Sequence, residues 1–287
     1  MTGTPQCGPY GGRAVPARER TRVQSRVDGA GHTVVEVAAP DIASRIQPGQ
    51  FVSLPAPPGI GPPARWMFSP LGVRRPHGAE PALRLVAQRS ANGALSRLKP
   101  GDPLDAIGPL GSPVALAQDV SSVVVLGLGH GAATAVFLTE TLRARGIACT
   151  PRLFTTGPAA PTTDTPWRLG DGTTEPLAQH RIHDAGDWPG LVRRTLDDAG
   201  ADHAVVTGPL ALLHAAADVC RQAAVGCTVL LEPFMACGIG LCLTCAVPLA
   251  ATDTTGPRHV GGCTDGPAFP AEAVDWERLL AGSGVRT

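Results

Sequence analysis

The sequence predicts a fold in two parts: a small antiparallel β-barrel up to about residue 115, then an open α/β sheet. Three observations support this prediction. Short strand signals lie at close spacing in the first part. From Ser121 onward, apolar strand-like runs alternate with helical patterns. Four closely spaced cysteines near the C-terminus indicate a separate ligand-bearing loop.

The expected barrel elements follow from turn residues and strand patterns. Residues 1–18 are rich in Gly, Pro and Arg without periodicity, so we expect a disordered extension there. The barrel strands and turns then follow in chain order. The expected elements are strands at 22–27 and 33–37, a turn into a strand at 48–54, a loop at 55–63, strands at 65–73 and 83–88, a short helix at 93–98, and a segment at 105–111 that leads to a turn.

The second part begins with a short apolar run of the kind buried in parallel sheets, at 122–127. A glycine-rich turn and a helical pattern at 132–145 follow it. Strand and helix patterns then continue to the cysteines, except that the polar stretch 156–188 has no clear assignment. The further expected elements are strands at 149–155, 203–207 and 228–231, and helices at 191–199 and 210–223.

Composition excludes several classes of function. The 24 basic residues balance 24 acidic ones, and aromatic residues make up only 4%, so neither a basic surface nor base-stacking platforms for nucleic acid are expected. There is no apolar run long enough for a membrane span, and the N-terminus lacks a secretory pattern. A cytoplasmic protein is therefore expected.

The four cysteines have the spacing of plant-type [2Fe–2S] ligands. Cys237, Cys242 and Cys245 form C-x4-C-x2-C, and Cys263 follows after seventeen residues. Glycines between the first two cysteines let the backbone curl around a cluster. Zinc and disulfide bonds are the alternatives. Zinc sites usually pair two CxxC motifs, and a chain of this length needs no disulfides to hold a core, so the cluster is favoured.

Two turns at expected strand ends predict a nucleotide site. Gly127, Gly129 and Gly131 lie between an apolar strand and a helix, where helix N-terminal amides can hold a pyrophosphate. Thr207 and Gly208 form the second turn, also at a strand's carboxyl end. The alternative for the first turn is close packing of strand against helix without a ligand, and the alternative for the second is an ordinary Gly-Pro turn.

Together these motifs resemble a known family. Residues 48–52, 93–102 and 107–111 look like barrel and flavin-binding segments of ferredoxin–NADP⁺ reductase-type flavoproteins. The cysteine motif followed by Cys263-Thr-Asp-Gly-Pro-Ala-Phe269 is similar to the electron-transfer subunit of two-subunit, NAD-linked dihydroorotate dehydrogenases. The resemblance covers about residues 20–276 and is most specific at the cysteines.

The resemblance implies FAD, a [2Fe–2S] cluster and NAD(H) as cofactors, and domains at 19–117 (FAD-binding barrel), 118–231 (NAD-binding) and 232–287 (cluster). It also implies a partner, an FMN-containing dihydroorotate dehydrogenase catalytic subunit of pyrimidine biosynthesis or a similar oxidoreductase, in a heterotetramer. Metal ligands would be the four cysteines. The implied cofactor-binding residues are Phe51, Arg65, Trp66, Met67, Phe68 and Ser69 near the flavin ring, Gly93, Ala94, Leu95 and Ser96 near its pyrophosphate, and Gly127, Gly129, Gly131, Thr207 and Gly208 for NAD(H).

The sequence departs from the family at defined positions. The flavin-contact motif Arg-Pro-x-Ser is here Arg65-Trp-Met-Phe-Ser69, which puts Trp66 in the arginine's place if Ser69 is the matching serine. His130 and Thr134 replace an apolar residue and a proline, and Thr207 replaces a cysteine. The alternative function is therefore an electron-transfer adaptor for another oxidoreductase, without effective NADH oxidation. No catalytic residue is assigned. NAD is favoured over NADP, although Arg152 keeps NADP open.

Overall fold

The computed structural model describes most of the chain. The described residues are 15–29, 31–55, 65–75, 78, 80–88, 95–156, 167–169, 177, 179–252 and 256–283, without the side chains of 88, 96 and 283. The first 14 residues of the expected extension and two predicted flavin-site residues, Gly93 and Ala94, lie outside this set. Among the described residues, no helix has both the length and the apolar character needed to cross a bilayer.

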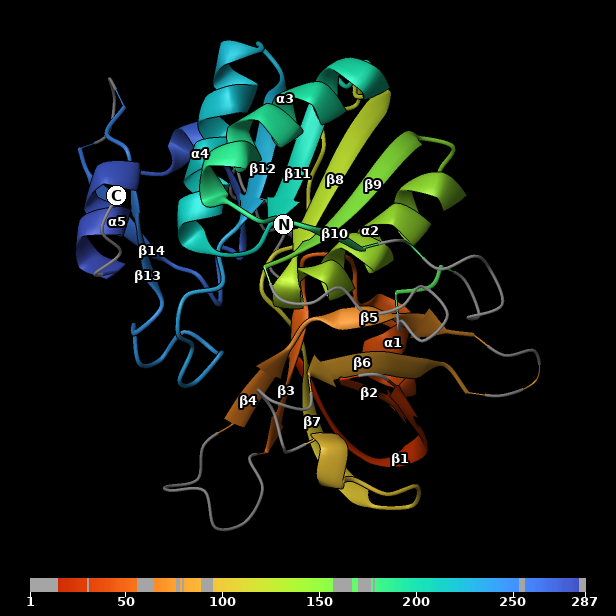
Figure 1. The fold of residues 1–287 in the computed structure, drawn as a ribbon. Helices are drawn as coiled ribbons and strands as arrows, with labels where there is room; N and C mark the ends of the chain where they lie inside the picture. The colour runs from red at the N-terminus through yellow and green to blue at the C-terminus, as the bar shows by residue number, and fades with distance from the viewer. Residues whose placement is uncertain are drawn as a thin grey trace, which may run out of the picture.

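Strands β1–β7 form one antiparallel sheet in the order β4-β3-β7-β1-β2-β6-β5. The two edge strands, β4 and β5, are consecutive in the chain and separated only by Ser69, so the sheet must curl back on itself. This gives the expected barrel (Figure 1). Its strands are β1 (Ala17–Gly29), β2 (His32–Val37), β3 (Phe51–Pro55), β4 (Arg65–Phe68), β5 (Pro70–Arg74), β6 (Ala82–Gln88) and β7 (Pro103–Leu110).

Three details of the barrel differ from expectation, and one of them is helix α1 (Pro40–Arg45), which was not expected. The segment 65–73, predicted as one strand, divides at Ser69 into the two edges of the sheet. Strand β1 begins at Ala17, inside the expected extension, because it pairs with β7 and because the Arg18 guanidinium binds the Asp105 carboxylate at 2.8 Å. Short helices α1 and η1 (Leu95–Arg97) connect barrel strands.

The second sheet has the order β10-β9-β8-β11-β12-β15, parallel except for β15. The chain runs outward from β8 to β9 and β10 on one side, and to β11 and β12 on the other. Ligands in open α/β sheets bind where the strand order reverses in this way. The strands are β8 (Ser122–Leu128), β9 (Ala148–Thr155), β10 (Gln179–Arg181), β11 (His203–Thr207), β12 (Gly226–Leu230) and β15 (Ala268–Pro270).

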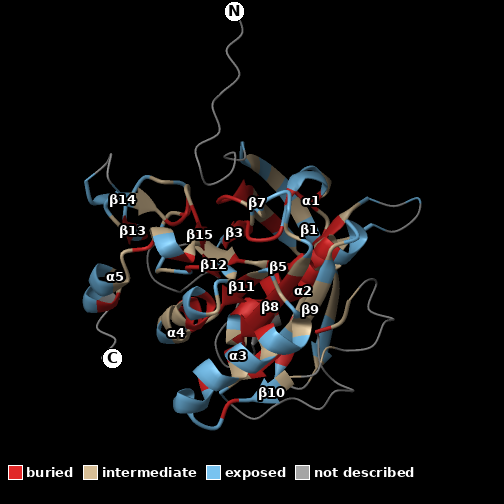
Figure 2. Ribbon diagram, turned by 90° about the horizontal axis from the view of Figure 1, so that it is seen from above, coloured by how far each residue is buried: buried red, intermediate tan, exposed pale blue. Residues whose placement is uncertain are grey.

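Successive side chains of β8 alternate between two cores. Val124 and Leu126 pack with α3 (Trp188–Ala199) and α4 (Leu210–Gln222), while Val123 and Val125 pack with α2 (Ala132–Ala144). Helix α2 lies between the sheet and the barrel, against β5 (Figure 1). Figure 2 shows buried residues along β8, β11 and β12 and exposed ones on the outer side of α3.

The C-terminal part is an excursion from the second sheet that returns to it. The cysteine loop leaves β12, and the hairpin of β13 (Ala246–Leu249) and β14 (Arg258–Gly261) follows. The chain then comes back as β15, which pairs with β12. The last elements are η5 (Ala271–Ala273) and α5 (Trp276–Ser283). The loop is therefore fixed to one sheet at both ends.

Candidate functional site

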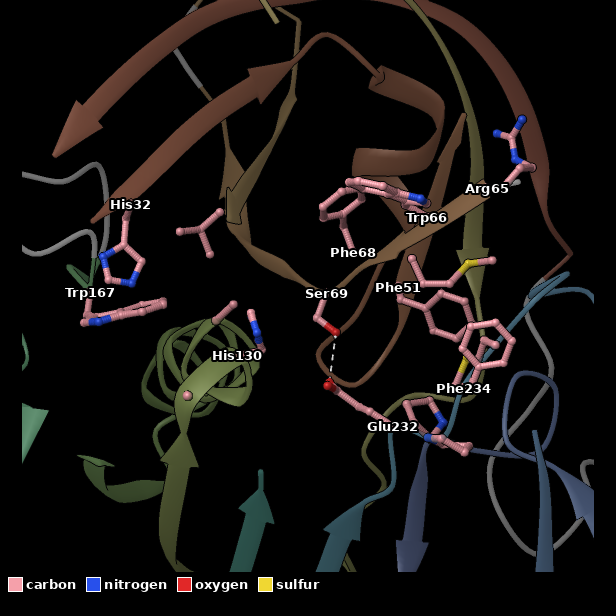
Figure 3. Close-up of a pocket in the computed structure, with 17 residues that line it drawn as sticks. His32, Phe51, Arg65, Trp66, Phe68, Ser69, His130, Trp167, Glu232 and Phe234 are labelled. Atoms are coloured by element: carbon pink, nitrogen blue, oxygen red, sulfur yellow. Dashed lines mark hydrogen bonds between the residues drawn. The ribbon is translucent and has the colours of Figure 1, made fainter. Parts of the chain in front are cut away.

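A pocket of about 390 Å³ lies between the barrel, the second sheet and the loop that precedes the cysteines. Its size is typical of small-molecule and cofactor sites. Five of the predicted flavin residues from β4 and the turn after it line this pocket, together with Phe51 of β3. Figure 3 shows Phe51, Ser69, Glu232 and Phe234 around one end of it. The pocket thus brings together residues that are far apart in the sequence.

Alternation along β4 separates the predicted flavin residues into two groups. Trp66 and Phe68 border the pocket, but their rings pack against the barrel core. Met67 packs instead in a small core with Phe51 and two of the cysteines. The Arg65 guanidinium donates to Ser53 Oγ at 2.7 Å and to the Asp105 carbonyl at 2.6 Å, so this residue ties three strands together.

The short helix η1 is described only in part. Leu95 is fully buried in the barrel core, so its side chain does not face the pocket. Ser96 belongs to η1, but its side chain lies outside the described atoms. The predicted pyrophosphate contacts of this segment therefore remain predictions.

Glu232 was missed by the sequence analysis and lies at the centre of the site. Ser69 Oγ donates a hydrogen bond to Glu232 Oε1 at 3.3 Å (Figure 3). The residue is open to solvent on the pocket side, yet surrounding protein reduces the hydration of its carboxyl and raises the pKa of Glu232, while the Ser69 hydrogen bond opposes this shift. Glu232 follows the carboxyl end of β12 after one intervening residue, Leu231, and that position is a sequence signal that could have identified it.

The other end of the pocket is formed by an aromatic pair that was also missed. The rings of His32 and Trp167 meet edge to face with centroids 5.2 Å apart. Both side chains are buried, and His130 stands between this pair and Ser69 (Figure 3). Trp167 belongs to the polar stretch that had no assignment, because an isolated tryptophan without periodicity gives no signal of its burial.

The two predicted nucleotide turns lie side by side, since Gly127 pairs with Thr207 across β8 and β11. Close packing explains two of the glycines: a Cβ at Gly127 would lie 2.7 Å from Ala135 Cβ, and one at Gly131 would lie 2.3 Å from Thr207 Oγ1. Gly129 is different. It has a φ of +57° and open space around its missing side chain, and it lines a pocket.

A second pocket, of about 840 Å³, opens over these turns. It is lined by Gly129, Gly131, Gly208 and elements of the C-terminal part. Helix α2 starts beside it without a side-chain cap, and the buried hydroxyl of Thr207 has no hydrogen-bond partner among the described residues. These features fit a nucleotide. The two pockets share Gly129, His130, Glu232, Pro233 and Phe234.

The four predicted ligand cysteines come together as two pairs. Cys237 Sγ and Cys242 Sγ are 3.3 Å apart, and the Cys263 amide donates to Cys245 Sγ at 3.4 Å. All four carry free thiols, which argues against the disulfide alternative. Within the described part of the chain, no three His, Cys, Asp or Glu side chains converge on one point as ligands of a single ion. Two separate pairs of cysteines fit a two-iron cluster, in which each iron takes two thiolates. They fit a single zinc ion, which needs four ligands around one point, less well.

Thiol surroundings differ within the pairs. Hydrogen bonds, first of all with Thr244, lower the pKa of the exposed Cys242 to about 6, while burial raises the pKa of Cys263 to about 12.

The cysteine loop is anchored on the barrel, because Ser112 N donates to the Gly266 carbonyl at 2.6 Å. Asp265 accepts from Gly261 N at 3.1 Å and so closes the turn that carries Cys263.

The cysteine loop presents an apolar surface. Phe234 and Leu241 are each 78% exposed, Leu243 is 69% exposed, and Ile239 is 45% exposed. Leu241 and Leu243 flank the exposed Cys242 in the chain. Met235 differs, because it packs partly buried beside Cys245 and Cys263. Large exposed apolar groups in one loop are typical of an interaction surface.

Comparison with known proteins agrees with this geometry. Residues 232–275 match the family described as the iron–sulfur cluster binding domain of dihydroorotate dehydrogenase B. The fold resembles an NADH-dependent reduced ferredoxin–NADP oxidoreductase, with a TM-score of 0.72, 24% identity and 91% of each chain covered. It also resembles the ferredoxin reductase in carbazole 1,9a-dioxygenase, with a TM-score of 0.54, 16% identity, and 73% and 64% covered.

Curated relatives extend the similarity over most of the chain. The dihydroorotate dehydrogenase B (NAD(+)) electron transfer subunit of Desulforamulus reducens is 31% identical over 251 residues, which cover 85% of this chain and 92% of that protein. The corresponding subunit of Bacillus mycoides is 30% identical over 232 residues, covering 79% and 86%. This chain therefore belongs to the family of dihydroorotate dehydrogenase B (NAD(+)) electron transfer subunits.

Proposed function

We propose that this chain passes electrons between NAD(H) and a dihydroorotate dehydrogenase catalytic subunit that carries FMN, in the cytoplasm and as part of pyrimidine biosynthesis. The observation that carries the proposal is the order of the sites. The nucleotide pocket adjoins the flavin pocket along Glu232, Pro233 and Phe234, and the first cysteine follows only a few residues later. The exposed apolar residues lie just before and between the first three cysteines.

The residues fit the implied cofactors. Bound FAD would exchange a hydride with the nicotinamide and single electrons with the cluster, which is the chemistry these groups supply. Phe51 and Met67 would form the apolar wall beside the flavin ring, and Ser69 and Glu232 its polar edge. Gly129 and the uncapped start of α2 would hold the nucleotide's phosphates. The two cysteine pairs would hold the cluster.

Gly208 and the turn that follows would border the nicotinamide, because they line the second pocket together with Glu232. Thr207, predicted for the same role, is buried and does not line this pocket. We favour NAD over NADP, since among the described residues of this pocket Arg278 is the single arginine, and it already lies 3.4 Å from the Asp275 carboxylate. Arg152, the residue that kept NADP open, lies on β9 with its side chain exposed and is not among the residues that line this pocket.

The exposed loop residues Phe234, Ile239, Leu241 and Leu243 would dock on the catalytic subunit, which would bring the cluster near the partner's cofactor. The expected assembly is a symmetric pair of heterodimers. Purification with a co-expressed catalytic subunit should give a stable complex that oxidises dihydroorotate with NAD⁺. A failure of every candidate subunit to bind or exchange electrons would refute the pyrimidine assignment.

The alternative is an adaptor that carries flavin and cluster for another oxidoreductase without effective NADH oxidation. Trp66 against the barrel core and His130 in the nucleotide turn are the features that favour it. Optical spectra separate the two possibilities. Both predict flavin and cluster absorption in the purified chain, but only the first predicts that NADH bleaches it.

A further inference from the structure

Strand β4, which borders the flavin pocket, contacts the cysteine loop through the side chain of Met67. A Cβ built on Gly238 would lie 2.7 Å from Met67 Cε and 2.8 Å from Met67 Sδ. The end of the thioether therefore rests directly on the bare backbone of Gly238, the residue after Cys237. Gly238 also has a φ of +71°, so the turn and the contact both require glycine.

Met67 also belongs to the wall between the pocket and the sulfur atoms. It lines the flavin pocket and packs, partly buried, in a small core that contains Phe51, Leu110, Cys245 and Cys263. Phe51 likewise lines the pocket and packs in the same small core. A single layer of side chains thus separates the flavin pocket from the cysteines.

Methionine suits this position. Its side chain is unbranched, flexible and polarisable, so it can fill the irregular space over the buried backbone of Gly238. If Ser69 is the serine of the related Arg-Pro-x-Ser motif, Met67 stands in the proline's place, and a proline ring would not reach Gly238. The contact is therefore a property of this chain's own sequence.

We propose that Met67 is a positioning residue that holds the flavin strand and the cluster loop at a fixed spacing and keeps water from the Cys237–Gly238 side of the cluster. This inference rests on the proposed function, because it concerns electron transfer between the two cofactors. Met67 is neither oxidised nor reduced. It acts through distance and hydration, which control the transfer rate and the cluster's potential.

Truncation should separate cluster chemistry from flavin chemistry. In Met67→Ala, the rate of cluster reduction, taken relative to the rate at which NADH bleaches the flavin of the same variant, should fall severalfold. The cluster's reduction potential should shift upward, because water entering beside Cys237 stabilises the more highly charged reduced state. Met67→Leu, which keeps most of the apolar volume, should recover most of the wild-type behaviour.

The experiment uses the purified flavin- and cluster-containing chain, with stopped-flow absorption for the rates and a redox titration followed by electron paramagnetic resonance for the potential. Leu191→Ala, a partly buried truncation on α3 far from both cofactors, is the matched control. Wild-type and Leu191→Ala rates and potentials should agree. Unchanged cluster potential and reduction rate in Met67→Ala would overturn the inference while leaving the proposed function intact.

A double-mutant cycle tests the contact independently of the cofactors. Gly238→Ala places a Cβ where the Met67 thioether lies, and it adds backbone strain that is the same in either background. Its cost in thermal unfolding should therefore be smaller in the Met67→Ala background than in wild type. Additive effects would refute the contact. A wild-type chain without flavin or iron would refute the proposed function, and the inference with it.

Discussion

Gly131→Ala tests whether the glycine turn serves packing or ligand binding. The new Cβ would lie 2.3 Å from Thr207 Oγ1, 2.8 Å from Thr207 Cγ2 and 2.9 Å from the Thr207 carbonyl carbon. The first two atoms belong to a buried side chain and the third to backbone, so the clash is not easily relieved. Such overpacking costs about 1–3 kcal/mol. At roughly 2–4 °C per kcal/mol for larger domains, the unfolding temperature should fall by several degrees.

Two companion variants make the test specific. Thr207→Ala removes both side-chain atoms of the clash, so in that background Gly131→Ala should cost less, with a residual penalty from the carbonyl carbon. Gly129→Ala meets no atom within 4 Å, although its φ of +57° costs about 1–2 kcal/mol. Because Gly129 lines both pockets, its variant should weaken NADH binding, measured by fluorescence titration. An unchanged unfolding temperature in Gly131→Ala, or no rescue by Thr207→Ala, would refute the packing argument.

Three further predictions address the cysteines and two titratable groups. Cys→Ser at any of the four proposed ligands should lower the iron content of the purified chain, whereas Cys220→Ser should not; normal iron in Cys263→Ser would exclude that residue as the fourth ligand. Glu232→Gln should raise the unfolding temperature at neutral pH, because the raised pKa of Glu232 makes its ionisation unfavourable in the folded state. This gain should disappear below about pH 4.5, where the carboxyl is protonated in both the folded and the unfolded state. An unchanged unfolding temperature at neutral pH would contradict the prediction. Burial lowers the pKa of His203, whose Nε2 lies 2.9 Å from Thr228 Oγ1, so the stability of the wild-type chain should decline as the pH falls below about 6.5. In His203→Gln, thermal unfolding should show a flatter decline over the same pH range. An equally steep decline in the variant would show that His203 does not cause it.

Local sequence signals predicted most of the strands and helices, and they failed where distant parts of the chain decide the structure. Helix α1 has Pro40 at its first turn and Asp41 beside it, a recognisable start signal. It is only six residues long, however, and the Glu19 carboxylate on β1 accepts from the amides of Asp41 and Ile42 at 3.2 and 3.1 Å. A cap supplied from another strand cannot be found by periodicity.

The break at Ser69 has a similar cause. Residues 65–73 have a continuous strand pattern, and nothing local shows that one half pairs with β3 and the other with β6. The curl of the sheet, which brings its two edge strands together in the chain at Ser69, imposes the division. It also places Ser69 opposite Glu232, which lies 163 residues away in the chain. The polar edge of the flavin pocket could therefore not be predicted from either segment alone.

The cysteines were predictable because ligand spacing is a chemical requirement that survives in the sequence. Their surroundings were not. Cys245 and Cys263 pack against Phe51 and Leu110 of the barrel, and the loop's turn at Gly266 is bound by Ser112. These contacts arise only once β15 returns the chain to the edge of the second sheet. The sequence thus predicts which atoms would bind iron, and the fold decides which side of the barrel they face.

Phe234 shows how the sites depend on one another. It lines both pockets, yet 78% of it is exposed. It also stands three residues before Cys237, on the loop that presents the apolar surface. A partner that docks on this surface must cover Phe234, and in doing so it must also cover part of the boundary that the two pockets share. The geometry therefore links assembly of the complex with exclusion of water from the place where nicotinamide and flavin would meet.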